Sequence, residues 1–168
     1  MSVAIASPGS RRRSDLARVL TAGTLVGILD GAFAVVLWVV IRQVTTIPRV
    51  FQSVAAGLLG RDAARAGGLP TAALGLAVHF AIALGWAAVY YFAYRRLPAL
   101  RRATRSIAGA IGVGLVYGML VWLAMDFIVL PLSRANPVPI SSPNFLIQLL
   151  GHPFVVGLPT ALVVRDRE

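Results

Sequence analysis

The chain has 168 residues, of which 58% are hydrophobic and only 13% are charged, and its mean hydropathy is +0.79. A typical soluble domain carries about 45–50% apolar and about 25% charged residues, so this composition indicates an integral membrane protein. The chain has no cysteine, which excludes a disulfide scaffold, a thiolate metal site and a cysteine nucleophile.

Four stretches of the sequence are long and apolar enough to cross a bilayer, because a helix needs about 20 apolar residues to span about 30 Å of hydrocarbon. The only charged residues inside these stretches are Asp30 and Asp126. The sequence therefore predicts an all-α integral membrane four-helix bundle over residues 19–164, between tails at 1–18 and 165–168. The predicted spans are residues 19–41, 71–94, 107–132 and 144–164.

The first span has one competing interpretation, a cleaved signal peptide, because Ala32, Phe33 and Ala34 resemble a small-residue cleavage site. The apolar run continues to Ile41, which makes it too long for the apolar core of a signal peptide. We therefore interpret it as an uncleaved span.

All 16 basic residues are arginines, and they give a formal net charge of +10. The positive-inside rule places both termini in the cytoplasm, and the charge then favours contact with an anionic cytoplasmic leaflet. Nucleic acid is not an expected partner, because the arginine clusters flank the spans without interleaved aromatic residues. The predicted cytoplasmic set is Arg11, Arg12, Arg13, Arg18, Arg95, Arg96, Arg101, Arg102, Arg105, Arg165 and Arg167, and the outer set is Arg42, Arg49, Arg61, Arg65 and Arg134.

The connection between the first two spans has its own helical pattern. Its apolar residues recur at the spacing of one helix face, and its polar and small residues fall on the other. We predict a short amphipathic interfacial helix over residues 47–66, with a re-entrant segment as the alternative. The apolar face is Ile47, Val50, Phe51, Val54, Ala55, Leu58 and Leu59, and the opposite face is Arg49, Gln52, Ser53, Ala56 and Gly60.

Each predicted span contains one ionisable residue: Asp30, His79, Asp126 and His152 in chain order. At a rise of 1.5 Å per residue, these residues lie about 16, 12, 9 and 12 Å from the outer ends of their helices. We therefore predict one intramembrane polar layer in the outer half of the bundle. Gln148 belongs to the same layer, because it precedes His152 by one helical turn.

Small residues and a proline accompany this layer. Gly-x-x-x-Gly spacing permits close approach between helices in a membrane. In the first span it places a row of glycines on the helix face that also carries Asp30. Pro153 follows His152 directly, and interrupted spans recur at substrate and ion sites. The predicted packing glycines are Gly23, Gly27 and Gly31 in the first span and Gly114 and Gly118 in the third.

The polar layer has several interpretations. A charge at the centre of a spanning helix costs at least about 2.5–3.5 kcal/mol, so something must compensate each aspartate. The layer could bind or relay a proton or a small cation, or it could only clasp the bundle of a structural membrane subunit. A third interpretation is a metal- or haem-dependent membrane enzyme, with a divalent metal on His79, His152, Asp30 and Asp126 or with haem b on the two histidines. We expect a protein that is not an enzyme and has no cofactor, and the alternatives stay open.

Four segments occur in an order that resembles a known group of proteins. In this order they are similar to a family of small, uncharacterised bacterial inner-membrane proteins, and more loosely to the YagU-like inner-membrane group. The resemblance implies a multi-pass protein of the bacterial inner membrane, and it carries no activity. A second copy of the chain or a membrane protein is the partner we consider. The segments are Phe51–Gly60 with Gly67–Gly68, Ala73–Phe80 with Val89–Tyr91, Tyr117–Ser133, and His152–Pro159 with the residues that follow.

Overall fold

The computed structural model describes residues 8–135 and 138–166, which contain no strand and are 84% helical. Four helices are long and apolar enough to cross a membrane, and each predicted span coincides with one of them, with ends that differ by four residues at most. Their bounds are Asp15–Ile41, Gly68–Arg96, Ile107–Val129 and Pro143–Val164.

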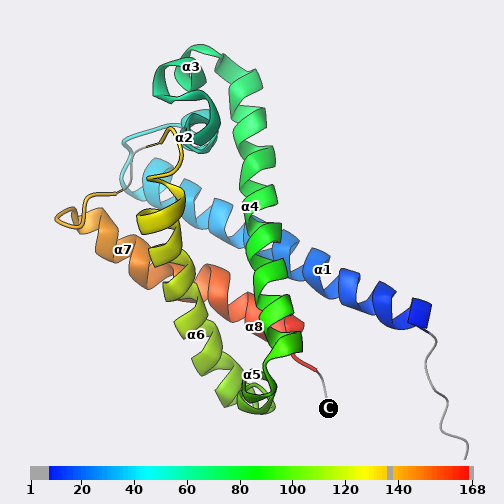
Figure 1. The fold of residues 1–168 in the computed structure, drawn as a ribbon. Coiled ribbons are helices and arrows are strands. Elements are labelled where there is room, and N and C mark those ends of the chain that lie inside the picture. Colours follow the sequence, from blue (N-terminus) through cyan, green and yellow to red (C-terminus); the bar gives the residue numbers. More distant parts are fainter. Residues whose placement is uncertain (1–7, 136–137, 167–168) are drawn as a thin grey trace, which may run out of the picture.

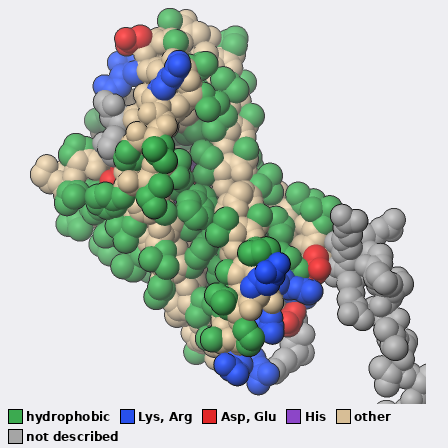
Figure 2. Space-filling view, viewed as in Figure 1, with side chains coloured by type: hydrophobic (Ala, Val, Ile, Leu, Met, Phe, Trp, Pro, Cys, Tyr) green, Lys and Arg blue, Asp and Glu red, His purple; other side chains and the backbone are tan. Residues whose placement is uncertain are grey.

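The first and fourth spans lie along one direction, and the second and third spans cross them (Figure 1). α1 (Pro8–Val35) packs across α4 (Gly68–Arg96) and against α8 (Leu158–Val164), which continues the direction of α7 (Pro143–His152). α6 (Ile107–Ala124) packs against α7 and α8 and is joined to α4 by the short α5 (Pro98–Ala103). On the face seen in Figure 2, hydrophobic side chains cover the middle of the molecule and the basic side chains gather at its two ends. This distribution is what a membrane-spanning protein requires.

The predicted packing glycines lie where helices touch. A Cβ atom on Gly23 would meet the backbone of Leu84, and one on Gly27 would meet the Phe80 ring, so these glycines let α1 approach α4. On α6, a Cβ on Gly114 or Gly118 would meet the backbone of the segment from His152 to Leu158. Glycine is therefore required at both helix crossings by the closeness of the neighbouring element.

The connection between the first two spans is two helices. α2 (Ile47–Leu59) and α3 (Arg61–Ala66) meet at Gly60, whose φ of 84° is accessible to glycine and strained for other residues. The prediction of one helix over residues 47–66 is wrong in this respect, because the chain turns sharply at Gly60.

α2 packs tightly on α4, since a Cβ on Gly75 would fall on the carbonyl group of Phe51. Gln52, which the helical pattern assigned to the polar face, is only 5% exposed. Its amide donates to the carbonyl oxygen of Gly68 at 2.7 Å and to the hydroxyl group of Thr71 at 3.3 Å. The helix is therefore held against α4 by hydrogen bonds as well as by apolar contacts, which a helical-wheel pattern cannot show.

Three of the four spans contain a π-helical turn: Val36–Ile41, Met125–Val129 and Pro153–Gly157. Such turns insert one extra residue per turn and are frequent at functional sites. The second contains Asp126, and the third begins immediately after His152, where Pro153 supplies no backbone N–H group. The irregular backbone thus lies beside the ionisable residues of these two spans.

Candidate functional site

Three of the four predicted ionisable residues converge at one site. His152 Nε2 lies 3.6 Å from Asp30 Oδ1, and His79 Nδ1 lies 4.0 Å from Asp30 Oδ2. The three side chains come from α7, α1 and α4, and they are 11%, 24% and 13% exposed respectively. We call Asp30, His79 and His152 the Asp–His site.

The second nitrogen of each imidazole ring contacts a backbone carbonyl oxygen. His79 Nε2 lies 2.9 Å from the carbonyl oxygen of Gly27, and His152 Nδ1 lies 2.7 Å from that of Gln148. A carbonyl oxygen can only accept a hydrogen bond, so each of these nitrogens carries a hydrogen and donates it. In a neutral imidazole the other nitrogen then has only a lone pair, and that nitrogen faces Asp30.

When the histidines are neutral and Asp30 is ionised, the Asp–His site therefore has no hydrogen-bond donor between its facing atoms. The carboxylate oxygens and the two facing nitrogens are then all acceptors. Among residues 8–135 and 138–166, no other group donates a hydrogen bond to Asp30. Polar groups removed from water are costly when they lack partners, so the site favours a bound proton or cation.

Aromatic rings enclose the two histidines. Phe51 and Phe80 meet the His79 ring edge to face, with ring centroids 6.2 Å and 5.8 Å away. Trp122 lies 4.7 Å from the His152 ring, and Phe33 meets that ring edge to face at 6.4 Å. These rings limit the access of water to the site, which strengthens electrostatic interactions there. The pattern of the sequence assigned Phe51 to an apolar face without indicating that this face covers a histidine.

Asp126 lies apart from this group. Its side chain is 2% exposed, and its Oδ1 accepts a hydrogen bond of 2.8 Å from the backbone N–H group of Val138. No ion pair within 4.0 Å joins it to a histidine in the part of the chain that the structure describes. The predicted four-residue layer is thus reduced to three residues, because the fourth fastens the connection that follows α6.

Gln148 contributes to the site through its backbone, since its carbonyl oxygen holds His152. Gly31 borders the same site, as a Cβ on this residue would lie 3.3 Å from His79 Nε2. In the described ranges, no group of three or more His, Cys, Asp or Glu side chains has an arrangement that could hold a metal ion. The geometry of these ranges therefore provides no set of ligands that would support the metal-site interpretation.

A second polar network, which sequence reasoning missed, joins the ends of three spans. Arg18 Nη1 donates to Asp166 Oδ1 at 2.7 Å and to the carbonyl oxygen of Val164 at 3.1 Å. The Tyr94 hydroxyl donates to Asp166 Oδ2 at 2.9 Å. The hydrogen bond from Arg18 lowers the pKa of Asp166. In the sequence, Arg18 contributes only to the count of charges that predicts topology, and nothing there pairs it with a residue 148 positions away.

Comparison of the chain with known protein families, with curated proteins and with solved structures finds no match. The resemblance to small bacterial inner-membrane proteins stays a prediction, and any function has to be argued from the geometry of this chain.

Proposed function

We propose that this chain is a multi-pass protein of the bacterial inner membrane whose Asp–His site binds and relays a proton. The observation that carries the proposal is the orientation of the two imidazole rings. Each ring has one nitrogen engaged by a backbone carbonyl and the other directed at the same carboxylate. This arrangement needs a proton that none of its own groups supplies in the ionised state.

The proton has several places to reside. On Asp30, it makes a carboxylic acid that donates to one imidazole. On His79 or His152, it makes an imidazolium that donates to the carboxylate. The two oxygens of Asp30 face different histidines, so a proton accepted from one ring can be passed to the other after a small movement of the carboxyl group.

A small monovalent cation is the alternative occupant. The charge of the Asp30 carboxylate would hold it in place of the proton, without a set of three side-chain ligands in the described ranges. Ionisable residues within spanning helices commonly mark ion and proton pathways.

The orientation with both termini in the cytoplasm is part of the proposal. It is supported by the excess of arginines in the tails and in the connection between the second and third spans. It places the network of Arg18, Tyr94 and Asp166 at the cytoplasmic end, next to an anionic leaflet.

A structural role is the second candidate, and one contact favours it. The hydrogen bond from His79 to the carbonyl oxygen of Gly27 joins α4 to α1 at 2.9 Å. If this clasp were the whole purpose of the site, removal of the histidines would cost stability and no proton movement would depend on them.

The two candidates are separated by proton flux in liposomes. The purified protein is reconstituted, a potassium-driven membrane potential is imposed, and the internal pH is followed with a trapped dye. We expect flux with the unmodified chain and none with a His79→Gln, His152→Gln double variant. Asp126→Asn is the matched control, because it removes the other aspartate of the spans and keeps an acceptor for Val138. An absence of flux in the unmodified chain, with a loss of stability in the double variant, would overturn the proton relay and favour the clasp.

A further inference from the structure

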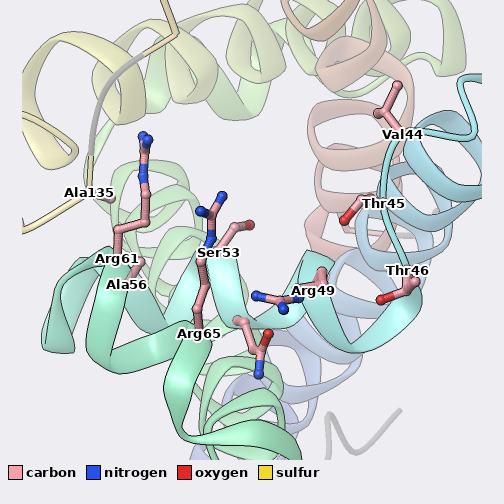
Figure 3. Close-up of a pocket in the computed structure, with 10 residues that line it drawn as sticks. Val44, Thr45, Thr46, Arg49, Ser53, Ala56, Arg61, Arg65 and Ala135 are labelled. Atoms are coloured by element: carbon pink, nitrogen blue, oxygen red, sulfur yellow. The ribbon is translucent and has the colours of Figure 1, made fainter.

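A cavity at the opposite end from the Arg18 network is lined by three arginines. It has a volume of about 710 Å³ and lies between the loop that follows the first span and the helices α2 and α3. Figure 3 shows the side chains of Arg49, Arg61 and Arg65 reaching into it from these two helices. We call this cavity the arginine pocket.

The arginines in this pocket lack acidic partners. Within residues 8–135 and 138–166, none of the three forms an ion pair within 4.0 Å, although Asp62 is adjacent to Arg61 in the chain. Three guanidinium groups around one cavity repel one another, and a bound anion would relieve that repulsion. Planar guanidinium groups match the oxygens of a phosphate group and donate to them in pairs.

The remaining lining residues add neutral hydrogen-bonding groups. Thr45, Thr46 and Ser53 bring hydroxyl groups to the pocket, and Figure 3 shows Ser53 between the arginine side chains and the two threonines across from it. Thr46 precedes the first turn of α2 and makes no capping hydrogen bond with its side chain. The positive end of the α2 dipole thus lies at the pocket and favours an anion there.

The pocket is built on a fixed base. Gln52 lines it and is 5% exposed, and its amide is held by the Gly68 carbonyl and the Thr71 hydroxyl. Because α2 also packs closely on α4 at Gly75, the backbone that carries Arg49 and Ser53 is held in place. A preorganised set of donors binds a ligand with less loss of conformational entropy than a flexible one.

From these observations we propose that the arginine pocket is a binding site for a phosphate ester. The three guanidinium groups bind the phosphate oxygens, and the hydroxyl groups of Thr45 and Thr46 bind the ester or its neighbouring hydroxyls. The Ser53 hydroxyl donates to the carbonyl oxygen of Val50 at 2.6 Å, so it is left as an acceptor for a hydroxyl group of the ligand. Two sources share this chemistry: a soluble sugar or glycerol phosphate, and the headgroup of an anionic phospholipid. Exposed apolar side chains flank the pocket, with Val44 69% and Ile47 51% exposed, and these suit the acyl region of a lipid.

The test measures binding to the full chain in detergent and in nanodiscs. The probes are inorganic phosphate, glycerol 3-phosphate, and nanodiscs of phosphatidylcholine with or without phosphatidylglycerol, with protein-bound lipid read by native mass spectrometry. An Arg49→Gln, Arg65→Gln double variant is expected to weaken binding at least about tenfold, because each charge-assisted hydrogen bond contributes strongly to affinity. Binding of the soluble phosphates identifies a soluble ligand, and retention of phosphatidylglycerol alone identifies a lipid headgroup.

Two further variants keep this test decisive. Ser53→Asp changes an exposed side chain and places a negative charge in the pocket; it is expected to abolish binding, and an unchanged circular dichroism spectrum serves as the check that the variant is folded. Arg134→Gln removes one positive charge from the same end of the molecule without changing the lining, and it is expected to bind as the unmodified chain does. No binding of any probe by the unmodified chain, or an equal loss with Arg134→Gln, would overturn the proposal.

Discussion

Asp30 and Asp126 are both aspartates within spanning helices, yet their surroundings differ. Asp126 is 2% exposed and has a backbone N–H group as a hydrogen-bond donor at 2.8 Å. Asp30 is 24% exposed and faces the acceptor nitrogens of two histidines. The carboxylate of Asp126 has a donor within the fold. The carboxylate of Asp30 has none among residues 8–135 and 138–166, and in the proposed function a proton or cation takes that place.

The two environments suit different roles for the two carboxylates. A buried carboxylate that already has its donor can hold a chain segment in place, as Asp126 does for Val138. A carboxylate that lacks a donor exchanges its partner, and so it can respond to pH or to an ion concentration. The comparison predicts opposite effects when each aspartate is replaced.

The largest expected effect is on the proton uptake of Asp30. Asp30→Asn removes the ionisable group and supplies an amide N–H that can donate to one of the facing imidazole nitrogens. We expect the proton uptake of the Asp–His site to fall, because the carboxyl group no longer accepts a proton or stabilises an imidazolium, while the free energy of unfolding is unchanged or higher because no charge is buried. Proton uptake on a pH step, measured with a dye, checks the first part, and unchanged uptake would contradict the assignment.

Replacing Asp126 should instead cost stability. Asp126→Ala leaves the N–H group of Val138 without its acceptor, and a hydrogen bond to a charged group is worth about 1.5–3 kcal/mol. Equilibrium unfolding in mixed micelles measures this loss. Asp126→Asn keeps an acceptor oxygen and is expected to restore most of the stability; a loss as large as that of alanine would show that the charge itself is needed.

A smaller effect should follow from crowding His79. Gly31→Ala places a Cβ about 3.3 Å from His79 Nε2, which presses on the hydrogen bond to Gly27 and should cost about 1 kcal/mol. Gly85→Ala is the matched control, because nothing lies within 4 Å of a Cβ there, and it should be neutral or slightly stabilising. Equal effects of the two substitutions on unfolding would show that His79 is not closely held.

The smallest effect is expected at Asp166. Its pKa is lowered mainly by the hydrogen bond from Arg18. The pair therefore stabilises the fold above the unfolded pKa of about 3.9, and this contribution is lost as the pH falls through the lower folded pKa. The Asp166 side chain is 64% exposed, so Asp166→Asn should cost less than about 1 kcal/mol. Unfolding of both proteins across this pH range checks the sign, since the difference should vanish in acid.

The sequence predicts the four long apolar helices because crossing a membrane imposes a simple rule of length and hydropathy. Depth counted along these helices also puts Asp30, His79 and His152 together, and the structure brings both histidines within 4.0 Å of Asp30. Depth alone does not show that Asp126 accepts a hydrogen bond from the backbone of Val138, in a connection whose path no helical pattern describes.

Two other features depend on tertiary contacts. Gln52 looks polar and exposed in a helical pattern, but it is buried by hydrogen bonds to residues near the start of α4. In the sequence, Arg49, Arg61 and Arg65 indicate topology, and Arg49 also lies on the polar face of the predicted helix; neither pattern brings the three together. Their common pocket arises from the turn at Gly60, which places α3 beside α2.

The most direct test of the central claim is nitrogen NMR of isotope-labelled histidine in nanodiscs, with assignment by single His→Gln variants. We predict that His79 Nε2 and His152 Nδ1 carry the ring hydrogens, and that the nitrogens facing Asp30 carry none when the rings are neutral. In Asp30→Asn the amide group can donate to one of these facing nitrogens, so the signal of that nitrogen should shift. A hydrogen on a facing nitrogen of a neutral ring, or facing-nitrogen signals that Asp30→Asn leaves unchanged, would contradict the claim that both rings direct an acceptor at this carboxylate.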